Sequence, residues 1–250
     1  APVVMRQLER MVGPDELRDG LREYLTRFAF ANATWTDLIE MLDRRTSEDL
    51  AAWSRVWVDE PGRPTIDTVL ESRNDKISRL AFSQTDPRGR SLVWNQTLEV
   101  ALGYDHGARI STLKMDSASV EVPRVGDLPL PHYVLPNSEG IGYGLFRLDD
   151  ASRQYFLKHL PAIGDSLTRG TVWVTLWDDM LEGRTNPRHL FDLMLAALPE
   201  EHEELTAEQI LGYARTSFWR FLTDAERNSV SARLEQVLRA GMKQAGTTSL

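Results

Sequence analysis

The sequence predicts a multidomain α+β protein in which a β-sandwich lies between two helical regions. Two observations lead to this fold class. At 250 residues the chain is long enough that we expect more than one hydrophobic core. The spacing of its apolar residues also changes from a period near 3.6 to a period of two, and then back again. These changes fall near Pro61 and Asp149, so we expect three domains, over residues 1–60, 61–150 and 151–250.

Residues 1–60 are expected to form four helices, because apolar residues recur there at helical spacing. Thr34 precedes Asp37 by three residues, which indicates an N-cap followed by a first-turn carboxylate. Thr46 or Ser47 is the expected cap of the fourth helix. The segment Pro61-Gly62-Arg63-Pro64 ends this region, because proline lacks an N–H donor and disfavours helical backbone at the residue before it.

Residues 65–149 are expected to form about seven short strands of a seven-stranded-type β-sandwich. Turn signals separate the strands; in Asp86-Pro87-Arg88-Gly89 the proline presets one φ angle and the glycine relieves another. The longest strand is predicted from Val93 to Tyr104, and the last from Gly144 to Leu148.

After Asp149 the helical period returns, and we expect an incomplete α-helical hairpin or solenoid domain over residues 151–250. Helices are predicted over residues 151–159, 166–181, 187–198, 207–222 and 224–242. Thr206-x-x-Gln209 and Thr223-x-x-Glu226 both match the capping box. The tail from Gly246 to Leu250 is expected to fray.

Composition excludes several classes of function. A net charge of −8 argues against a nucleic-acid partner, because such proteins need a basic face. No apolar run approaches the roughly 18 residues that span a bilayer, so no membrane partner is expected. The chain has no cysteine, which excludes disulfides, thiolate metal sites and a cysteine nucleophile, and fits a cytoplasmic protein.

The sequence contains no constellation of catalytic, cofactor-binding or metal-ligating residues, and we predict none. A zinc peptidase helix carries His-Glu-x-x-His, which places two imidazoles on one face beside a general base. The nearest match is His202-Glu203-Glu204-Leu205-Thr206, where threonine occupies the second ligand position. The five histidines show no other ligand spacing.

Three further features have structural interpretations. Gly140-Ile141-Gly142-Tyr143-Gly144 precedes a predicted strand, whereas a phosphate-binding loop follows a strand and opens a helix. Asp178 and Asp179 are adjacent on a helix and therefore point about 100° apart, which disfavours a shared catalytic proton. Trp173, Trp177 and Trp219 could line a ligand groove, but their helical setting favours packing between helices.

Three segments together resemble a known family. The run from Phe28 to Leu38, Phe-Ala-Phe-Ala-Asn-Ala-Thr-Trp-Thr-Asp-Leu, is similar to the Phe-x-x-x-Asn-Ala-Thr-x-x-Asp-Leu signature of aminopeptidase N-like zinc metallopeptidases, the gluzincins. A tryptophan-bearing helix and a Pro-Gly-x-Pro step follow it, as in the family. Asn137 to Asp149 resembles the family's asparagine, Gly-Tyr and closing aspartate, although Leu145 stands where the family has arginine.

The resemblance implies the C-terminal portion of such an enzyme: late helices of a thermolysin-like catalytic domain, a β-sandwich and a helical domain. The parent enzyme would remove N-terminal amino acids from peptides, using a zinc-activated water, a glutamate base and a tyrosine. Those residues are expected before Ala1, so zinc is expected in the parent and none in this chain. The implied partners are peptide substrates and the missing N-terminal half; the chain would wall the peptide chamber.

A second hypothesis is a non-enzymatic sandwich-plus-helical adaptor that binds a peptide or protein partner. The two hypotheses differ at residues 1–60. A fragment is expected to present an unusually apolar surface there, where the missing half packed, and an adaptor is not. The density of Leu, Val and Trp in this region favours the fragment.

Overall fold

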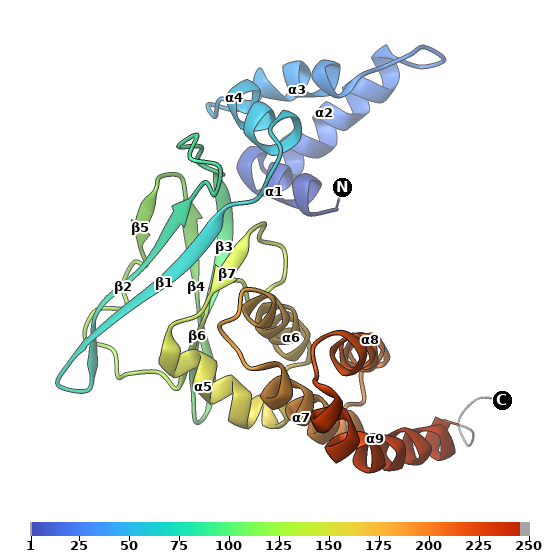
Figure 1. The fold of residues 1–250 in the computed structure, drawn as a ribbon. Coiled ribbons are helices and arrows are strands. Elements are labelled where there is room, and N and C mark those ends of the chain that lie inside the picture. Colours follow the sequence, from blue (N-terminus) through green and yellow to red (C-terminus); the bar gives the residue numbers. More distant parts are fainter. Residues whose placement is uncertain (1, 246–250) are drawn as a thin grey trace.

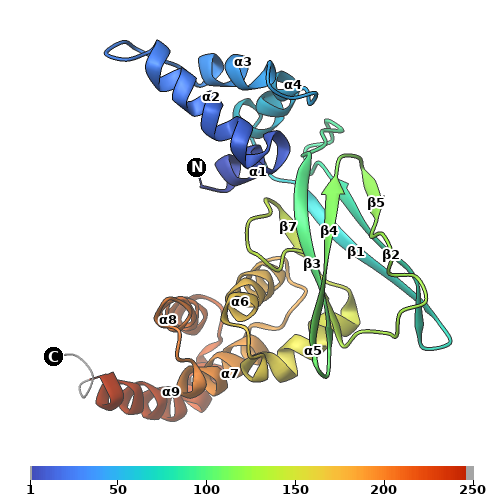
Figure 2. The same cartoon turned by 180° about the vertical axis from the view of Figure 1, so that it is seen from behind.

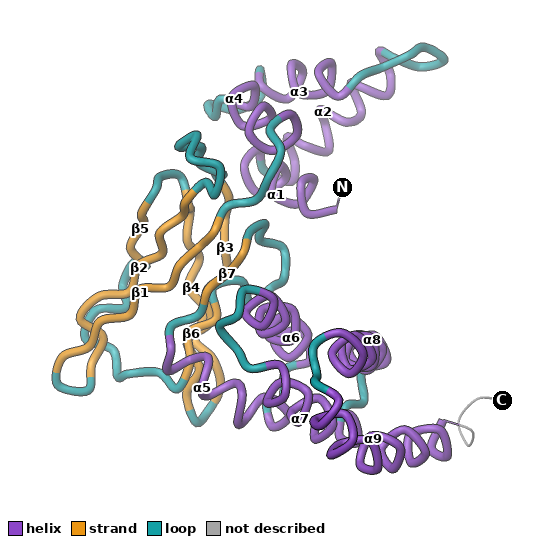
Figure 3. Tube along the Cα trace, in the orientation of Figure 1, coloured by secondary structure: helices purple, strands orange, loops and turns teal. Residues whose placement is uncertain are grey.

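The structure is a computed structural model that describes residues 2–245, and the predicted frayed tail from Gly246 to Leu250 lies outside them. The described residues form a mixed α/β fold with two small sheets and no closed barrel (Figures 1 and 3). Helices come first: α1 (Pro2–Val12), α2 (Pro14–Arg27), α3 (Trp35–Asp43), α4 (Leu50–Ser54) and a π-helical turn over Arg55–Asp59. The four helices predicted in this region are confirmed.

The strands and the remaining helices then follow in the expected order. The strands are β1 (Thr65–Arg73), β2 (Lys76–Thr85), β3 (Gln96–Tyr104), β4 (Gly107–Met115), β5 (Ser119–Glu121), β6 (Tyr133–Leu135) and β7 (Leu145–Arg147). The helices are α5 (Asp150–His159), α6 (Ser166–Leu181), α7 (Pro187–Ala197), α8 (Glu204–Arg220) and α9 (Asp224–Ala245). Helices α1–α4 lie at one end of the strand region, and α5–α9 lie on another side of it (Figure 2).

The N-terminal helices pack around a hydrophobic cluster of their own. Leu8, Leu42 and Leu50 are fully buried at its centre. The large apolar side chains exposed among residues 2–60 are Leu25, Phe30 and Val58. The Leu, Val and Trp content that suggested an apolar outer face is therefore explained by an internal core, and it does not discriminate between the fragment and the adaptor.

The caps of these helices confirm one prediction and correct another. Thr34 and Asp37 form a complete capping box at the start of α3, as expected. The cap of α4 is Asp49, whose carboxylate accepts the N–H of Ala52. Thr46 and Ser47 were the wrong residues, because the Thr46 hydroxyl accepts the N–H of Glu48 within the preceding turn.

The strands form one sheet in the order β5-β2-β1-β7 and another in the order β4-β3-β6. Neighbours are antiparallel except β1 and β7, which pair in parallel. One hydrophobic cluster takes its buried side chains from both sheets, among them Ile66, Phe82, Val100 and Val134. On β3, Ala101 lies between Val100 and Leu102 of this cluster but belongs to the cluster of the C-terminal helices. Strand β3 is therefore buried on both faces.

The start of β3 differs from the prediction, since the strand begins at Gln96 and not at Val93. The Trp94 N–H donates to the Gln84 side chain at 3.0 Å instead of to a neighbouring strand. The Asn95 carbonyl accepts the indole N–H groups of Trp53 at 3.0 Å and Trp57 at 3.1 Å. The Trp94 ring is fully buried in the cluster of the N-terminal helices. The alternation of apolar residues therefore extends upstream of the hydrogen-bonded strand, because Trp94 packs into the core of the N-terminal helices.

Helices α5–α9 share the third cluster, which includes the fully buried Phe156, Leu176, Phe191 and Met194. The predicted capping box at Thr223 and Glu226 is confirmed by the three hydrogen bonds between these residues. The one predicted at Thr206 is wrong, because α8 begins at Glu204 and Thr206 lies inside its first turn. Thr206 is buried where α8 approaches Gly170 of α6, so packing decides its position.

Two buried glutamines bind backbone groups of distant residues: Gln7 connects α1 to the strand region, and Gln96 connects β3 to the loop before β7. Gln7 of α1 is 2% exposed; its amide oxygen accepts the Thr97 N–H at 2.8 Å, and its amide nitrogen donates to the carbonyls of Thr97 at 3.0 Å and Ile141 at 3.1 Å. Gln96, also 2% exposed, makes the same paired contact with the N–H and carbonyl of Tyr143. Each side chain thereby acts like the edge of a neighbouring strand.

We predict that Gln7→Ala lowers the free energy of unfolding by about 2 kcal/mol, because it leaves the partly buried Thr97 N–H and the Ile141 carbonyl without the partners that Gln7 supplies. Urea unfolding followed by tryptophan fluorescence measures the effect. The matched control is Gln154→Ala on α5, an exposed glutamine, for which we expect a change within about 0.5 kcal/mol. Equal effects of the two substitutions would contradict the role given to Gln7.

Candidate functional site

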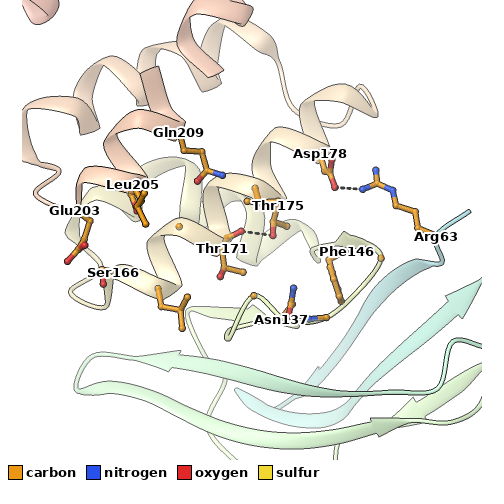
Figure 4. A pocket seen from close by; sticks show the side chains of 17 residues that line it. Arg63, Asn137, Phe146, Ser166, Thr171, Thr175, Asp178, Glu203, Leu205 and Gln209 are labelled. Atoms are coloured by element: carbon orange, nitrogen blue, oxygen red, sulfur yellow. Dashed lines mark hydrogen bonds and ion pairs between the residues drawn. The ribbon is translucent and has the colours of Figure 1, made fainter. Parts of the chain in front are cut away.

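A cleft of about 480 Å³ opens between the strand region and helices α6 and α8 (Figure 4). We call it the loop–helix cleft. One wall is the loop from Asn137 to Gly144 with Phe146 of β7, and the other comes from α6 and the first turns of α8. Its volume falls within the range of about 300–1,000 Å³ that is typical of ligand sites.

The loop wall is held in place by side-chain amides. Asn137 accepts the Gly142 N–H at 2.8 Å, and Gln96 holds both backbone groups of Tyr143. A Cβ on Gly142 would lie 2.6 Å from Leu98 and 2.7 Å from Phe146, so only glycine fits there. Since its backbone is fixed at several points, this wall presents a preformed surface to the cleft.

The helix wall is lined by small and hydroxyl-bearing residues. Gly170, Thr171 and Thr175 of α6 line its middle, and the Thr175 hydroxyl donates to the Thr171 carbonyl at 2.9 Å. Gln209 of α8 and Asn137 of the loop point into the cleft from opposite walls (Figure 4). The cleft therefore carries amide and hydroxyl groups on both sides.

The two ends of the cleft both carry charged side chains, an ion pair at one end and a carboxylate at the other. At one end Arg63 donates to Asp178 across the two walls at 2.9 Å, with the arginine side chain 44% exposed and the aspartate 17% exposed. At the other end Glu203 lies beside Ser166 (Figure 4). Apolar side chains of Leu167, Val174 and Leu205 are exposed along the helix wall.

Glu203 is positioned by a buried ion pair next to it. Arg169 donates to both carboxylate oxygens of Glu201, at 2.6 and 2.9 Å, and Glu201 also accepts the backbone N–H of Glu203 at 3.0 Å. The hydrogen bonds from Arg169 hold the pKa of Glu201 below its usual value. This arrangement fixes the turn before α8 and leaves the Glu203 carboxylate exposed at the mouth.

Behind the helix wall, Asp179 faces away from the cleft into a group of arginines. It is 0% exposed, and one of its oxygens accepts from Arg184 at 3.2 Å. Arg184 also donates to the Leu148 carbonyl at 2.8 Å, and Arg153 donates to the Arg184 carbonyl. Burial raises the pKa of Asp179 to about 6, and the attraction of Arg184, Arg153 and Arg147 only partly opposes this effect.

The raised pKa predicts a pH-dependent stability that Asp179→Asn removes. The folded-state pKa of Asp179 lies above the unfolded value. Protonation of Asp179 therefore contributes fully to the stability of the fold below about pH 4, and this contribution is lost as pH rises through about 6. A shift of about two units corresponds to about 3 kcal/mol. We expect the wild-type chain to lose about that much stability relative to Asp179→Asn between pH 4 and pH 7, measured by urea unfolding. Parallel pH profiles of the two proteins would contradict this.

The structure separates Asp178 from Asp179, as their helical spacing predicted: one reaches Arg63 at the cleft and the other reaches Arg184 behind it. The segment Gly140–Gly144 enters β7, as predicted, and it also lines the cleft. Trp173 is buried in the helical core, and Trp177 stacks on Tyr213 with ring centroids 4.3 Å apart. Trp219 is exposed beside a separate groove between α8 and α9.

The histidine-containing segments are not brought together into a metal site. His202 lies in the turn before α8, and Thr206, at the second ligand position, is buried against Gly170. Within residues 2–245 there is no group of three or more His, Asp or Glu side chains that could hold a metal ion. Nor does any helix in this range have the length and apolar character needed to cross a membrane.

Sequence reasoning did not identify Arg63, Asn137, Thr171 or Gln209 as residues of one site. They lie in four separate elements and share no local spacing. The one available signal was the alternation of glycines at 140, 142 and 144, which indicates a backbone that is closely approached by other groups.

Comparison with known proteins finds sequence similarity to several aminopeptidases. The chain is 24% identical to the aminopeptidase N of Streptomyces lividans over an alignment of 261 positions, gaps included, that covers 97% of this chain and 30% of that protein. The chain is aminopeptidase N-like. Other relatives of this aminopeptidase N-like chain are aminopeptidase A of Gloydius brevicauda, 22% identical over 73% of the chain, and a probable aminopeptidase 1 of Sulfurisphaera tokodaii, 24% identical over 48%.

No protein-family model matches the aminopeptidase N-like chain. The chain spans less than a third of the length of the curated relatives it matches: 30% of the Streptomyces protein, 17% of the Gloydius protein and 14% of the Sulfurisphaera protein.

Proposed function

We propose that this chain is the C-terminal portion of a zinc-dependent aminopeptidase that removes N-terminal amino acids from peptides. The observation that carries the proposal is the similarity to an aminopeptidase N along 97% of the chain. The order of the signature at 28–38, the Pro-Gly-x-Pro step at 61–64 and the segment 137–149 supports it independently.

In this proposal the three regions have separate roles. Residues 1–60 supply the last helices of a thermolysin-like catalytic domain, residues 61–150 form a β-sandwich, and residues 151–250 belong to a helical domain that walls the peptide chamber. Two features support this layout. Helix gives way to strand between Asp59 and Thr65, and strand gives way to helix between Arg147 and Asp150. The buried Gln7 then connects residues 1–60 to residues 61–150.

In this proposal no residue of this chain binds the zinc. The segment that most resembles a zinc motif contains a buried threonine at the second ligand position, and its histidine precedes the helix. We therefore derive no catalytic step from these residues. The zinc, the base and the oxyanion donor would come from the other part of the parent enzyme, and this chain would support the site and contact the peptide.

The test compares this chain with a chimera that joins it to the unmatched remainder of Streptomyces lividans aminopeptidase N. We expect the chain alone to bind no stoichiometric zinc and to release no product from aminoacyl-anilides. We expect the chimera to bind zinc and to turn over. Metal analysis and the anilide assay are run on both proteins, with the unmatched remainder alone as the control. Stoichiometric zinc together with turnover in the 250-residue chain would overturn the proposal.

A non-enzymatic adaptor remains the second candidate, because the loop–helix cleft could serve peptide binding without catalysis. The chimera separates the two. An adaptor restores no activity when it is joined to the catalytic remainder, whereas a C-terminal portion of the enzyme does.

A further inference from the structure

We propose that the loop–helix cleft binds a short extended peptide, with a carboxylate of the peptide at Arg63 and a cationic group at Glu203. The inference rests on the proposed function only in taking a peptide as the ligand. It assigns a binding site within this chain, with its own polarity, and it can be tested without catalysis.

The chemistry that recognises a peptide backbone already recurs within the fold. Gln7, Gln84 and Gln96 each use a side-chain amide to accept a backbone N–H and to donate to a backbone carbonyl. Asn137 and Gln209 present the same group to the cleft from its two walls, and the Gln209 nitrogen also donates to the Tyr213 hydroxyl at 3.3 Å (Figure 4). The Asn137 oxygen is engaged by Gly142, while its nitrogen has no hydrogen-bond partner among the described residues. A bound chain with exposed N–H and carbonyl groups matches these amides.

The charged ends give the site a direction. Asp178 accepts from one Nη of Arg63 and so orients the guanidinium, while the other N–H groups of Arg63 find no partner within residues 2–245. Arginine binds a carboxylate through two parallel N–H groups, and such pairs are selective in geometry. At the opposite end, the exposed Glu203 carboxylate is held near Ser166 by the fixed turn at Glu201. An anionic group of the ligand can therefore bind the remaining N–H groups of Arg63, and a cationic group can bind the Glu203 carboxylate.

Apolar groups favour a peptide over a small zwitterion. Leu167, Val174 and Leu205 are exposed along the helix wall, and Phe146 lines the loop wall. Side chains of an extended peptide alternate in direction, so they can contact these residues while the main chain meets the amides. The cleft thus offers main-chain, side-chain and end-group contacts together.

The test is titration calorimetry of the 250-residue chain with a pentapeptide, Lys-Ala-Leu-Ala-Ala, that has a free carboxyl terminus. Three further peptides accompany it: the same peptide amidated at its C-terminus, an amidated peptide that ends in aspartate, and an acetylated peptide with alanine in place of lysine. The amidated pair distinguishes a terminal carboxylate from a side-chain carboxylate as the group bound at Arg63.

We expect Arg63→Gln to weaken binding of the peptide with a free carboxyl terminus about tenfold. Binding of the same peptide with an amidated C-terminus should be unchanged. The affinity of Arg63→Lys for the peptide with a free carboxyl terminus should lie between those of the wild type and Arg63→Gln, because lysine keeps the charge and loses the paired geometry. Glu203→Gln should weaken binding of the lysine peptide about fivefold and spare the acetylated peptide. Gln209→Ala should weaken binding of every peptide.

Matched controls are Arg79→Gln, at an arginine of β2 that pairs with carboxylates on β1 and β5, and Glu235→Gln, at an exposed glutamate of α9 that pairs with Arg239. Neither should change any affinity, and unfolding curves confirm that each variant is folded. Absence of binding up to millimolar peptide, or equal affinities for wild type, Arg63→Gln and Glu203→Gln, would overturn the proposal. Either result would leave the zinc and chimera experiments unaffected, so the failure of one proposal is distinguishable from the failure of the other.

Discussion

The architecture depends on how three consecutive residues at the start of β3 use their polar groups. β6 pairs only with Ala101–Gly103, so no strand lies along the first half of β3 on that edge, where Ser138 donates to the Glu99 carbonyl. An open strand edge presents unsatisfied N–H and carbonyl groups. Here the edge at Thr97 is covered by the Gln7 side chain, and the Asn95 carbonyl is covered by two indole N–H groups. A helix thereby completes a sheet without adding a strand.

The same segment determines the shape of the cleft. Gln96 reaches the opposite way and holds Tyr143, and the Tyr143 ring contacts Trp57 with centroids 5.6 Å apart. The Tyr143 hydroxyl donates to the Gly62 carbonyl at 3.0 Å, next to Arg63. The loop wall of the cleft and its arginine are therefore connected to the N-terminal helices through the contacts of Tyr143. Helix α1 also contacts this loop directly, since the Gln7 amide donates to the Ile141 carbonyl.

Secondary structure could be predicted from the sequence more fully than contacts between distant residues. The helices and strands follow the apolar periods, and the capping boxes at Thr34 and Thr223 follow local chemistry. The errors at Val93 and Thr206 have a common physical cause: apolar or hydroxyl-bearing residues were engaged by distant elements that no local window contains. The resemblance at 28–38 and 137–149 indicated the family, yet it could not indicate the cleft. Arg63, Asn137, Thr171 and Gln209 become neighbours only after the whole chain has folded.

The position of Trp94 has a consequence for how such proteins can be recombined. The residue belongs by sequence to the strand region, but its ring fills the centre of the helical core built by residues 8–57. A crossover placed at the Pro61–Pro64 step, which is the natural choice from the change in secondary structure, would pair the helices of one parent with the tryptophan of another. The compatible exchange unit extends through residue 97, since it then carries the ring, the Asn95 carbonyl and the Thr97 backbone together with the helices that surround them.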